Sequence, residues 1–167
     1  MTKENTKGKK GFTIIEVVLV LAIAGLIFLM VFIALPALQR SQRDTQRRDD
    51  MARFMSQLNQ YQANNAGKVP SDYTSFINQY LKAGGDSFAD PSTGTDYTIV
   101  GTWPCTTGEC DGSKDFKKVA EDTDARGKIY IYTNARCEGE YPKYIQGNRK
   151  IAIRIKLEGA GIYCGNN

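Results

Sequence analysis

The longest uninterrupted apolar segment of the chain runs from residue 17 to residue 35 (VVLVLAIAGLIFLMVFIAL). As an α-helix this segment would be about 28 Å long, at roughly 1.5 Å per residue. Because the hydrocarbon core of a bilayer is about 30 Å thick, the pattern predicts a transmembrane helix over residues 12–36. Glu16 lies at the start of this helix, where a charge is costly and indicates a functional position.

Residues 37–66 are polar at first but keep a helical pattern. Opposite charges at i, i+4 support a helix there: Arg40/Asp44, Asp44/Arg48 and Asp49/Arg53. An apolar stripe follows at spacings of three and four, formed by Met51, Phe54, Met55, Leu58 and Tyr61. The sequence therefore predicts one long helix over residues 13–65, which is apolar, then polar, then amphipathic, and which a segment rich in Asn, Gly and Pro terminates.

Pro36 lies inside this predicted helix. A proline removes one helical hydrogen bond, so we expect a kink or local melting just before it. Two interpretations stay open: Pro36 either marks the end of the membrane span or provides a flexible point within an assembly.

Residues 67–167 are predicted to form an exposed globular domain. The segment 71–81 has its apolar residues on one helical side and predicts a short helix. Strand patterns occupy residues 97–100, 128–133 and 150–157. The last of these alternates cleanly, so we expect one face to pack on the helix stripe and the other to face solvent; the packed residues are Ile151, Ile153, Ile155 and Leu157. The predicted fold class is α+β, a long helix on a small antiparallel sheet.

The net charge of +4 comes from the N-terminal part of the chain. Four lysines and one acid precede Phe12, which places the N-terminus in the cytoplasm and the remaining chain outside it. Residues 64–167 hold 13 basic and 13 acidic residues, and aspartates separate the arginines of the helix. Specific binding of nucleic acid is therefore not expected.

A secretory signal peptide fits the N-terminus poorly, because an h-region has about 7–15 residues and ends in a small-residue cleavage site. A simple anchor helix would leave Glu16 unexplained. The stretch KGFTIIEVVLVLAI, with Gly11, Phe12 and Glu16 in register, resembles the class III signal of type IV pilins and related pseudopilins. The resemblance is clear over residues 7–63.

The resemblance implies that residues 1–11 are a leader peptide, which prepilin peptidase removes between Gly11 and Phe12. It also implies N-methylation of Phe12, and pairing of Glu16 with the new amine of a neighbouring subunit. The expected partners are other copies of the chain, prepilin peptidase, the inner-membrane assembly machinery and the membrane itself. The mixed charges of residues 39–50 would then face other subunits and fix their axial register.

Such subunits build extracellular filaments that serve attachment, twitching motility or DNA uptake. The resemblance equally includes type II secretion pseudopilins, which form a short piston-like fibre. A membrane-anchored extracellular binding protein that never polymerises is the alternative from another class.

Four cysteines, Cys105, Cys110, Cys137 and Cys164, follow the predicted membrane span. An even number in an extracytoplasmic domain favours disulfides, and four cysteines allow three connectivities. We favour Cys105–Cys110, which closes a short loop, and Cys137–Cys164, which ties the C-terminal segment to the sheet. Zinc binding by the four thiolates is the alternative, disfavoured because the chain has no histidine.

Neither a catalytic site nor a cofactor is predicted, because the chain has no His and no phosphate-binding glycine loop. The segment 122–127 resembles the start of an EF-hand, but Arg126 and Thr133 stand where calcium ligands are needed. A surface turn is the preferred interpretation, and calcium binding through the acidic loops stays an alternative. The predicted role is structural rather than enzymatic.

Overall fold

The computed structural model describes residues 11–108, 110, 119, 125–147, 149–159 and 161–167. The leader residues 1–10 and the first residues of the EF-hand-like segment lie outside this part of the chain. The chain divides between Gln39 and Arg40 into two compact units, which are described separately below.

Helix α1 (Ile14–Asn64) contributes to both units, and it confirms the single long helix expected from the sequence. Its helical assignment continues through Pro36, so of the two effects expected there, a kink or local melting, the local melting does not occur. The helix ends where Ala66 and Gly67 adopt positive φ angles of 52° and 79°, and the Gly67 amide donates to the Gln62 carbonyl at 2.7 Å. Glycine adopts such a conformation without steric cost, which explains this C-terminus.

In the first unit, the large apolar side chains from Phe12 through Leu38 are exposed, and those from Ile14 onward belong to α1. By length and composition this helix is able to cross a membrane, and no residue of its most apolar stretch is buried. A contiguous apolar surface of this size requires cover from lipid or from another protein.

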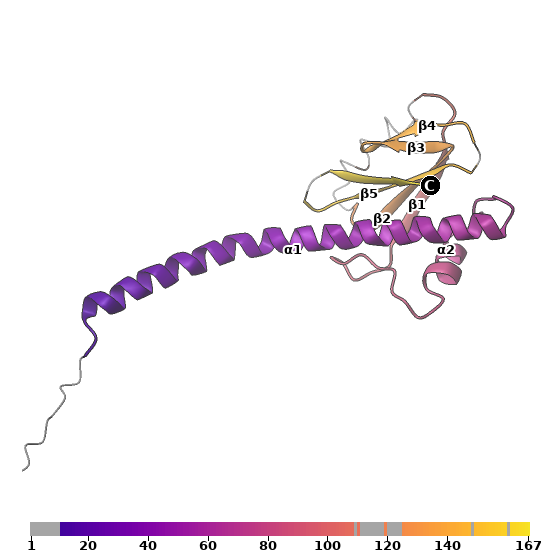
Figure 1. The fold of residues 1–167 in the computed structure, drawn as a ribbon. Helices are drawn as coiled ribbons and strands as arrows, with labels where there is room; N and C mark the ends of the chain where they lie inside the picture. The colour runs from indigo at the N-terminus through magenta and orange to yellow at the C-terminus, as the bar shows by residue number, and fades with distance from the viewer. Residues whose placement is uncertain (1–10, 109, 111–118, 120–124, 148, 160) are drawn as a thin grey trace, which may run out of the picture. The chain divides into compact units, whose positions relative to one another are not determined.

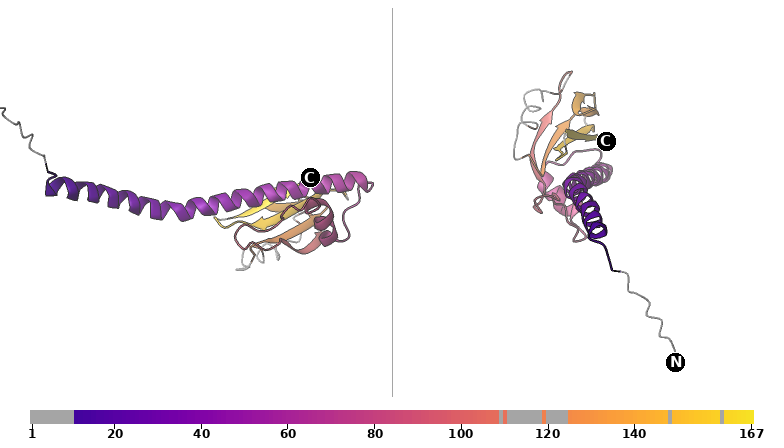
Figure 2. Two further views of the ribbon diagram at one scale, coloured as in Figure 1. Left: turned by 90° about the horizontal axis from the view of Figure 1, so that it is seen from below. Right: turned by 90° about the vertical axis from the view of Figure 1, so that its left-hand side faces the viewer.

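The second unit is built on a four-stranded sheet with the order β1-β2-β5-β6. Its strands are β1 (Thr98–Pro104), β2 (Lys128–Thr133), β5 (Ile151–Lys156) and β6 (Ile162–Asn166). A hairpin of β3 (Ala135–Glu138) and β4 (Tyr141–Tyr144) forms a separate two-stranded sheet. Figures 1 and 2 show residues 40–64 of α1 lying across one face of the larger sheet, with the hairpin on the side of the sheet away from the helix. The arrangement is α+β, as predicted.

One strand pair differs from the antiparallel sheet expected from the sequence. β1 and β2 are parallel, whereas β2–β5 and β5–β6 are antiparallel. Parallel neighbours need a long crossover connection, and residues 105–127 provide it. The sequence could not reveal this direction, because an alternating strand pattern is the same for either orientation.

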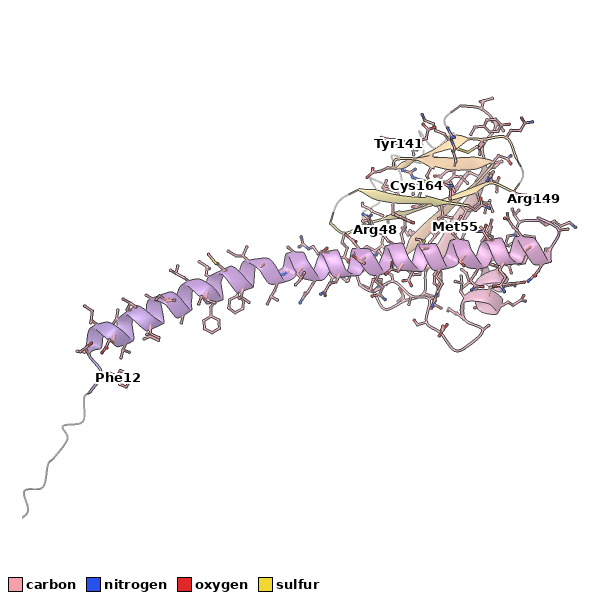
Figure 3. The ribbon with its side chains drawn as sticks, in the orientation of Figure 1. Phe12, Arg48, Met55, Tyr141, Arg149 and Cys164 are labelled. Atoms are coloured by element: carbon pink, nitrogen blue, oxygen red, sulfur yellow. A yellow bond between two sulfur atoms is a disulfide. The ribbon has the colours of Figure 1, made fainter. Side chains whose placement is uncertain are left out.

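The main core lies between α1 and the sheet. Met51, Phe54 and Leu58 are fully buried on the helix, and Met55 beside them is labelled in Figure 3. Opposite them lie the isoleucines of β2 and β5. The segment 71–81 also folds as predicted: α2 (Tyr73–Phe76) continues into the π-helical turn η1 (Ile77–Leu81), whose apolar residues complete the core. The predicted packing of the β5 isoleucines on the helix stripe is thus confirmed.

The other face of β5 was expected to face solvent, and that expectation is wrong. Ala152 and Arg154 are both fully buried there. A second apolar cluster covers this face, and it includes Ala135 of the hairpin together with Cys105 and Cys110. β3, β4 and β6 have four or five residues each and contain Pro, Gly or Cys. Their sequences therefore lack the alternating pattern from which a strand is predicted.

The core packing gives a stability prediction. Leu58→Ala should lower the free energy of unfolding by about 2–5 kcal/mol, because it removes a fully buried side chain from the helix–sheet interface. The exposed Gln60, two positions further along the helix, provides the control, and Gln60→Ala should change stability by less than about 0.5 kcal/mol. Chemical unfolding of the full chain in detergent micelles measures both. Equal effects of the two substitutions would contradict this packing.

Candidate functional site

The N-terminal candidate residues lie within two turns of the start of α1. Gly11 and Phe12 precede the helix, and the Phe12 side chain is 91% exposed. A Cβ placed on Gly11 would meet no atom within 4 Å. The peptide bond between these two residues is therefore outside regular structure and open to approach.

Thr13 and Glu16 form a reciprocal helix cap. The Thr13 amide and hydroxyl donate to Glu16 Oε2 at 2.9 and 2.8 Å, and the Glu16 amide donates to Thr13 Oγ1 at 3.4 Å. This capping box satisfies backbone donors that the first helical turn leaves free. The carboxylate is thus held in a fixed position by its own chain, and both bonds from Thr13 end on the same oxygen.

A family model matches residues 6–32 and describes them as a prokaryotic N-terminal methylation motif. The chain carries the class III signal of type IV pilins. This motif belongs to structural pilin-type subunits rather than to enzymes. Neither the curated proteins nor the solved structures gave a match to this chain.

The class III signal includes Gly11, Phe12 and Glu16, so motif and geometry concern the same residues. The match supports a prepilin-like protein of pilin or pseudopilin type, and the exposed apolar helix is consistent with membrane anchoring. The match stops at residue 32, so the outer domain must be interpreted from its own structure.

A buried cluster of charges joins α1 to the outer domain, and we call it the Arg47 cluster: Arg43, Asp44, Arg47, Asp90 and Glu158. The Arg47 guanidinium is fully buried and bonds two carboxylates from distant segments, with Nε to Asp90 Oδ2 at 2.6 Å and Nη2 to Glu158 Oε1 at 2.8 Å. Further bonds run to Asp90 Oδ1, Asp44 Oδ1 and the Ser92 hydroxyl. Such a forked arrangement uses all three nitrogens of the guanidinium.

The other members of the cluster hold the same three segments together. Arg43 donates from Nη2 to Glu158 Oε2 at 2.6 Å. Asp44 accepts from the backbone amides of Glu158 and Gly159 at 2.8 and 2.7 Å. A Cβ on Gly159 would lie 3.0 Å from Asp44 Oδ2, so this turn fits closely against the helix. The cluster therefore connects one stretch of α1 to the turn between β5 and β6 and to the loop around Asp90.

These contacts correct two expectations from the sequence. The helix charges were expected to pair at i, i+4, as Arg40/Asp44, Asp44/Arg48 and Asp49/Arg53, but Asp44 pairs with Arg47 and Arg53 with Asp86 instead. They were also expected to face other subunits, whereas Asp44 and Arg47 are buried in their own domain. One signal was present: both continue the helix stripe toward the N-terminus at spacings of three and four. The carboxylate partners lie 43 and 111 residues away from Arg47, which no local pattern reveals.

The cluster controls the protonation of Asp90 and Glu158. Burial by itself raises the pKa of Asp90, but hydrogen bonds from Arg47 and Ser92 outweigh it and lower this pKa to about 2. Hydrogen bonds from Arg43, opposed by burial and supported by Arg47, lower the pKa of Glu158 to about 2 as well. Burial would lower the pKa of Arg47, yet its bonds to Asp90 and Glu158 raise it above the ordinary value. All three groups are therefore charged at neutral pH.

A second set of contacts continues along the helix. Tyr97 donates to Asp50 Oδ2 at 2.9 Å, and Arg53 Nη2 donates to the Ser87 carbonyl at 2.8 Å. Burial raises the pKa of Asp50, against the effect of the Tyr97 hydrogen bond. The loop between η1 and β1 is thus attached to α1 at successive turns.

All four cysteines are in disulfides, Cys105–Cys110 and Cys137–Cys164, which is the pairing favoured from the sequence. The second bond joins β3 to β6 and so attaches the hairpin to the main sheet. The loop closed by the first bond is held to β4, because the Tyr144 amide donates to the Gly108 carbonyl at 2.8 Å. Zinc binding by the four cysteines would need free thiolates, and all four are in disulfides. The described residues also contain no group of three potential metal ligands.

The lowered pKa values predict how stability responds to acid. A carboxyl whose pKa is lower in the folded than in the unfolded state contributes stability that is complete above about pH 4.5 and is lost as pH falls toward 2. Unfolding free energy should therefore be nearly constant from pH 7 to 5. Below that range it should fall by up to about 1.4 kcal/mol per pH unit for each such group.

Asp90→Asn tests the assignment. This variant should lose about 3–5 kcal/mol at pH 7, because it leaves the buried Arg47 charge partly unpaired, and it should then fall less steeply between pH 4.5 and 2. Asp86→Asn in the exposed loop before β1 is the control and should retain the full acid slope. Urea titrations at a series of pH values give the slopes. An unchanged slope in Asp90→Asn would show that Asp90 does not cause the acid response.

Proposed function

We propose that this protein is a structural, non-enzymatic subunit of a type IV pilus, which polymerises into an extracellular filament. The observation that carries the proposal is the position of Glu16 within the class III signal. It is an acid at the start of an exposed apolar helix, four residues beyond the exposed Phe12. Before assembly the subunit is a single-pass membrane protein, with its N-terminus in the cytoplasm and its outer domain outside.

The first step of the proposed pathway is removal of the leader. Prepilin peptidase cuts between Gly11 and Phe12, and the new terminus is N-methylated. The accessibility of this bond, outside the helix, supports the step. The cut creates an α-amino group that is cationic at neutral pH, directly beside the apolar segment.

The second step is pairing between subunits. A single acid in a hydrocarbon environment is costly, and an opposite charge from a neighbour reduces that cost while fixing the relative position of two helices. The Thr13 contacts support this role, because they hold the carboxylate still while both end on Oε2. Among the described residues, no hydrogen bond ends on Oε1, so that oxygen remains available for the neighbour's amine.

The third step is exchange of lipid for protein around the apolar helix. Its side chains from Phe12 to Leu38 are exposed in the single subunit, and neighbouring copies of the same helix would cover them in a filament. Assembly in this way requires the inner-membrane pilus machinery, which extracts subunits from the bilayer. Adhesion, twitching motility or DNA uptake is the proposed use of the completed fibre.

The processing step predicts a defined N-terminus. Mass spectrometry of the protein purified from its native cell should find N-methylphenylalanine at position 12 and no residues of the leader. A mature chain that still begins with Met1 in assembled material would exclude processing at Gly11.

The pairing step predicts that the charge of Glu16 is required for assembly. Glu16→Ala and Glu16→Gln should both be inserted and processed but should yield few or no filaments in electron micrographs. The glutamine variant is decisive, because Gln supports a capping box as Glu does but has no charge. The exposed acid Glu138, replaced by Gln, is the control and should leave filaments normal.

The same micrographs separate the alternatives. If Glu16→Gln assembles as wild type, capping rather than charge pairing is the role of this residue. If Glu16→Ala has no effect on any activity, the protein is a non-polymerising membrane-anchored receptor. Short fibres that form only together with a type II secretion system would identify a pseudopilin.

A further inference from the structure

The apolar contact between α1 and the sheet does not by itself define where the helix lies along its axis. Its buried residues include Met51 and Met55, and Phe54 and Leu58, which are pairs of similar residues four positions apart. A slide by about one turn, or about 5.4 Å, in either direction would bring one member of each pair to the site of the other. Apolar burial is roughly proportional to area and non-directional, so it discriminates weakly between such positions.

The Arg47 cluster does discriminate between them. Arg47 is fully buried and makes five hydrogen bonds to Asp44, Asp90, Ser92 and Glu158. Sliding the helix by one turn would separate the guanidinium from Asp90 and Glu158 and leave buried charges unpaired. Unpaired buried charges are strongly destabilising, whereas each apolar pair still offers a similar residue to one of its two sites.

A neutral polar anchor lies at the other end of the same apolar stripe. Gln62 is buried, and its Nε2 donates to the Arg149 carbonyl at 3.0 Å. Its Oε1 accepts from Asn167 Nδ2, also at 3.0 Å. Arg149, labelled in Figure 3, is packed against the turn that follows α1, because a Cβ on Gly67 would clash with its guanidinium. The apolar stripe is thus flanked by a charged and a neutral hydrogen-bonding site.

We propose that Arg47 is a positioning residue that specifies the axial register of α1 on its own outer domain, with Gln62 as a secondary determinant. A buried ion pair is often no more stabilising than well-packed apolar residues, whereas a buried polar group is well suited to fix register. In an assembly of many identical subunits, a single register gives every copy the same outer surface. The inference does not depend on filament formation.

The experiment measures the register directly in the full chain in detergent micelles. Nitroxide labels at Gln60→Cys on α1 and Thr98→Cys on β1, both exposed positions, report the distance between helix and sheet by pulsed electron paramagnetic resonance. Wild-type side chains at the cluster should give one narrow distance distribution. The variant Arg47→Met/Asp90→Asn/Glu158→Gln is charge-free at Arg47 and at its two distant partners. This charge-free variant should give a second population, or a broad one, displaced along the helix axis by about 5.4 Å. Adding Gln62→Leu should enlarge that population.

Two comparisons separate positioning from a general loss of structure. The charge-free variant should unfold cooperatively with a melting temperature close to that of wild type, although its register is no longer unique. Arg48→Met, at an exposed neighbouring arginine that lies 5.8 Å over the Tyr163 ring, should keep the single distance. If the charge-free variant fails to fold, the Arg47→Lys variant tests whether Arg47 specifies the register. Lysine keeps the charge but cannot form the five-bonded fork, so two populations are expected.

A single narrow distance in the charge-free variant, both alone and with Gln62→Leu, would overturn the proposal. A single narrow distance in Arg47→Lys would overturn it if the charge-free variant does not fold. Because all distances come from single subunits, these outcomes are independent of whether Glu16 variants assemble into filaments.

Discussion

The charge of Arg47 has to be neutralised in the interior of the outer domain, and much of the domain's arrangement follows from this constraint. The guanidinium forms ion pairs with Asp90, from the loop before β1, and with Glu158, from the turn after β5. Asp44 then accepts the backbone amides of that turn. Two segments distant in the sequence are therefore fixed against one stretch of α1. The apolar core beneath them supplies most of the favourable burial. The hydrogen bonds of the cluster are directional, so they fix the position of the helix in a way that apolar burial does not.

A second constraint acts at the other end of the same helix. There the side chains must be compatible with lipid, and Glu16 is the exception. In the single subunit the capping box with Thr13 meets part of its hydrogen-bonding demand within the chain. The charge itself is not neutralised by Thr13, and this residual cost is the physical reason for proposing a partner from outside. On α1, the charge of Arg47 is thus neutralised by its own domain, whereas we propose that the charge of Glu16 is neutralised by a second copy of the chain.

The two cores of the outer domain explain why so small a unit can carry an extended helix. One face of the sheet packs on α1, and the other packs on residues near the Cys105–Cys110 bond and on the hairpin. The Cys137–Cys164 bond holds that hairpin to β6. Disulfides stabilise small exported domains mainly by restricting the unfolded chain, which compensates for a limited core. The central strands β2 and β5 are therefore buried on both faces, whereas β1 and β6 at the edges keep exposed or half-buried residues.

The sequence by itself determined what local patterns encode. The apolar run and its flanking charges indicated the membrane helix, the register of Gly11, Phe12 and Glu16 indicated the signal, and the 3–4 and 2-residue periods located α1, α2, β2 and β5. It could not show that β1 and β2 are parallel, because strand direction leaves no trace in alternation. Nor could it show that Arg47 and Arg154 are buried, because a charged residue in an amphipathic pattern is ordinarily solvated. Tertiary structure decided these points, since the groups that meet a buried charge or cover a sheet face come from segments far along the chain.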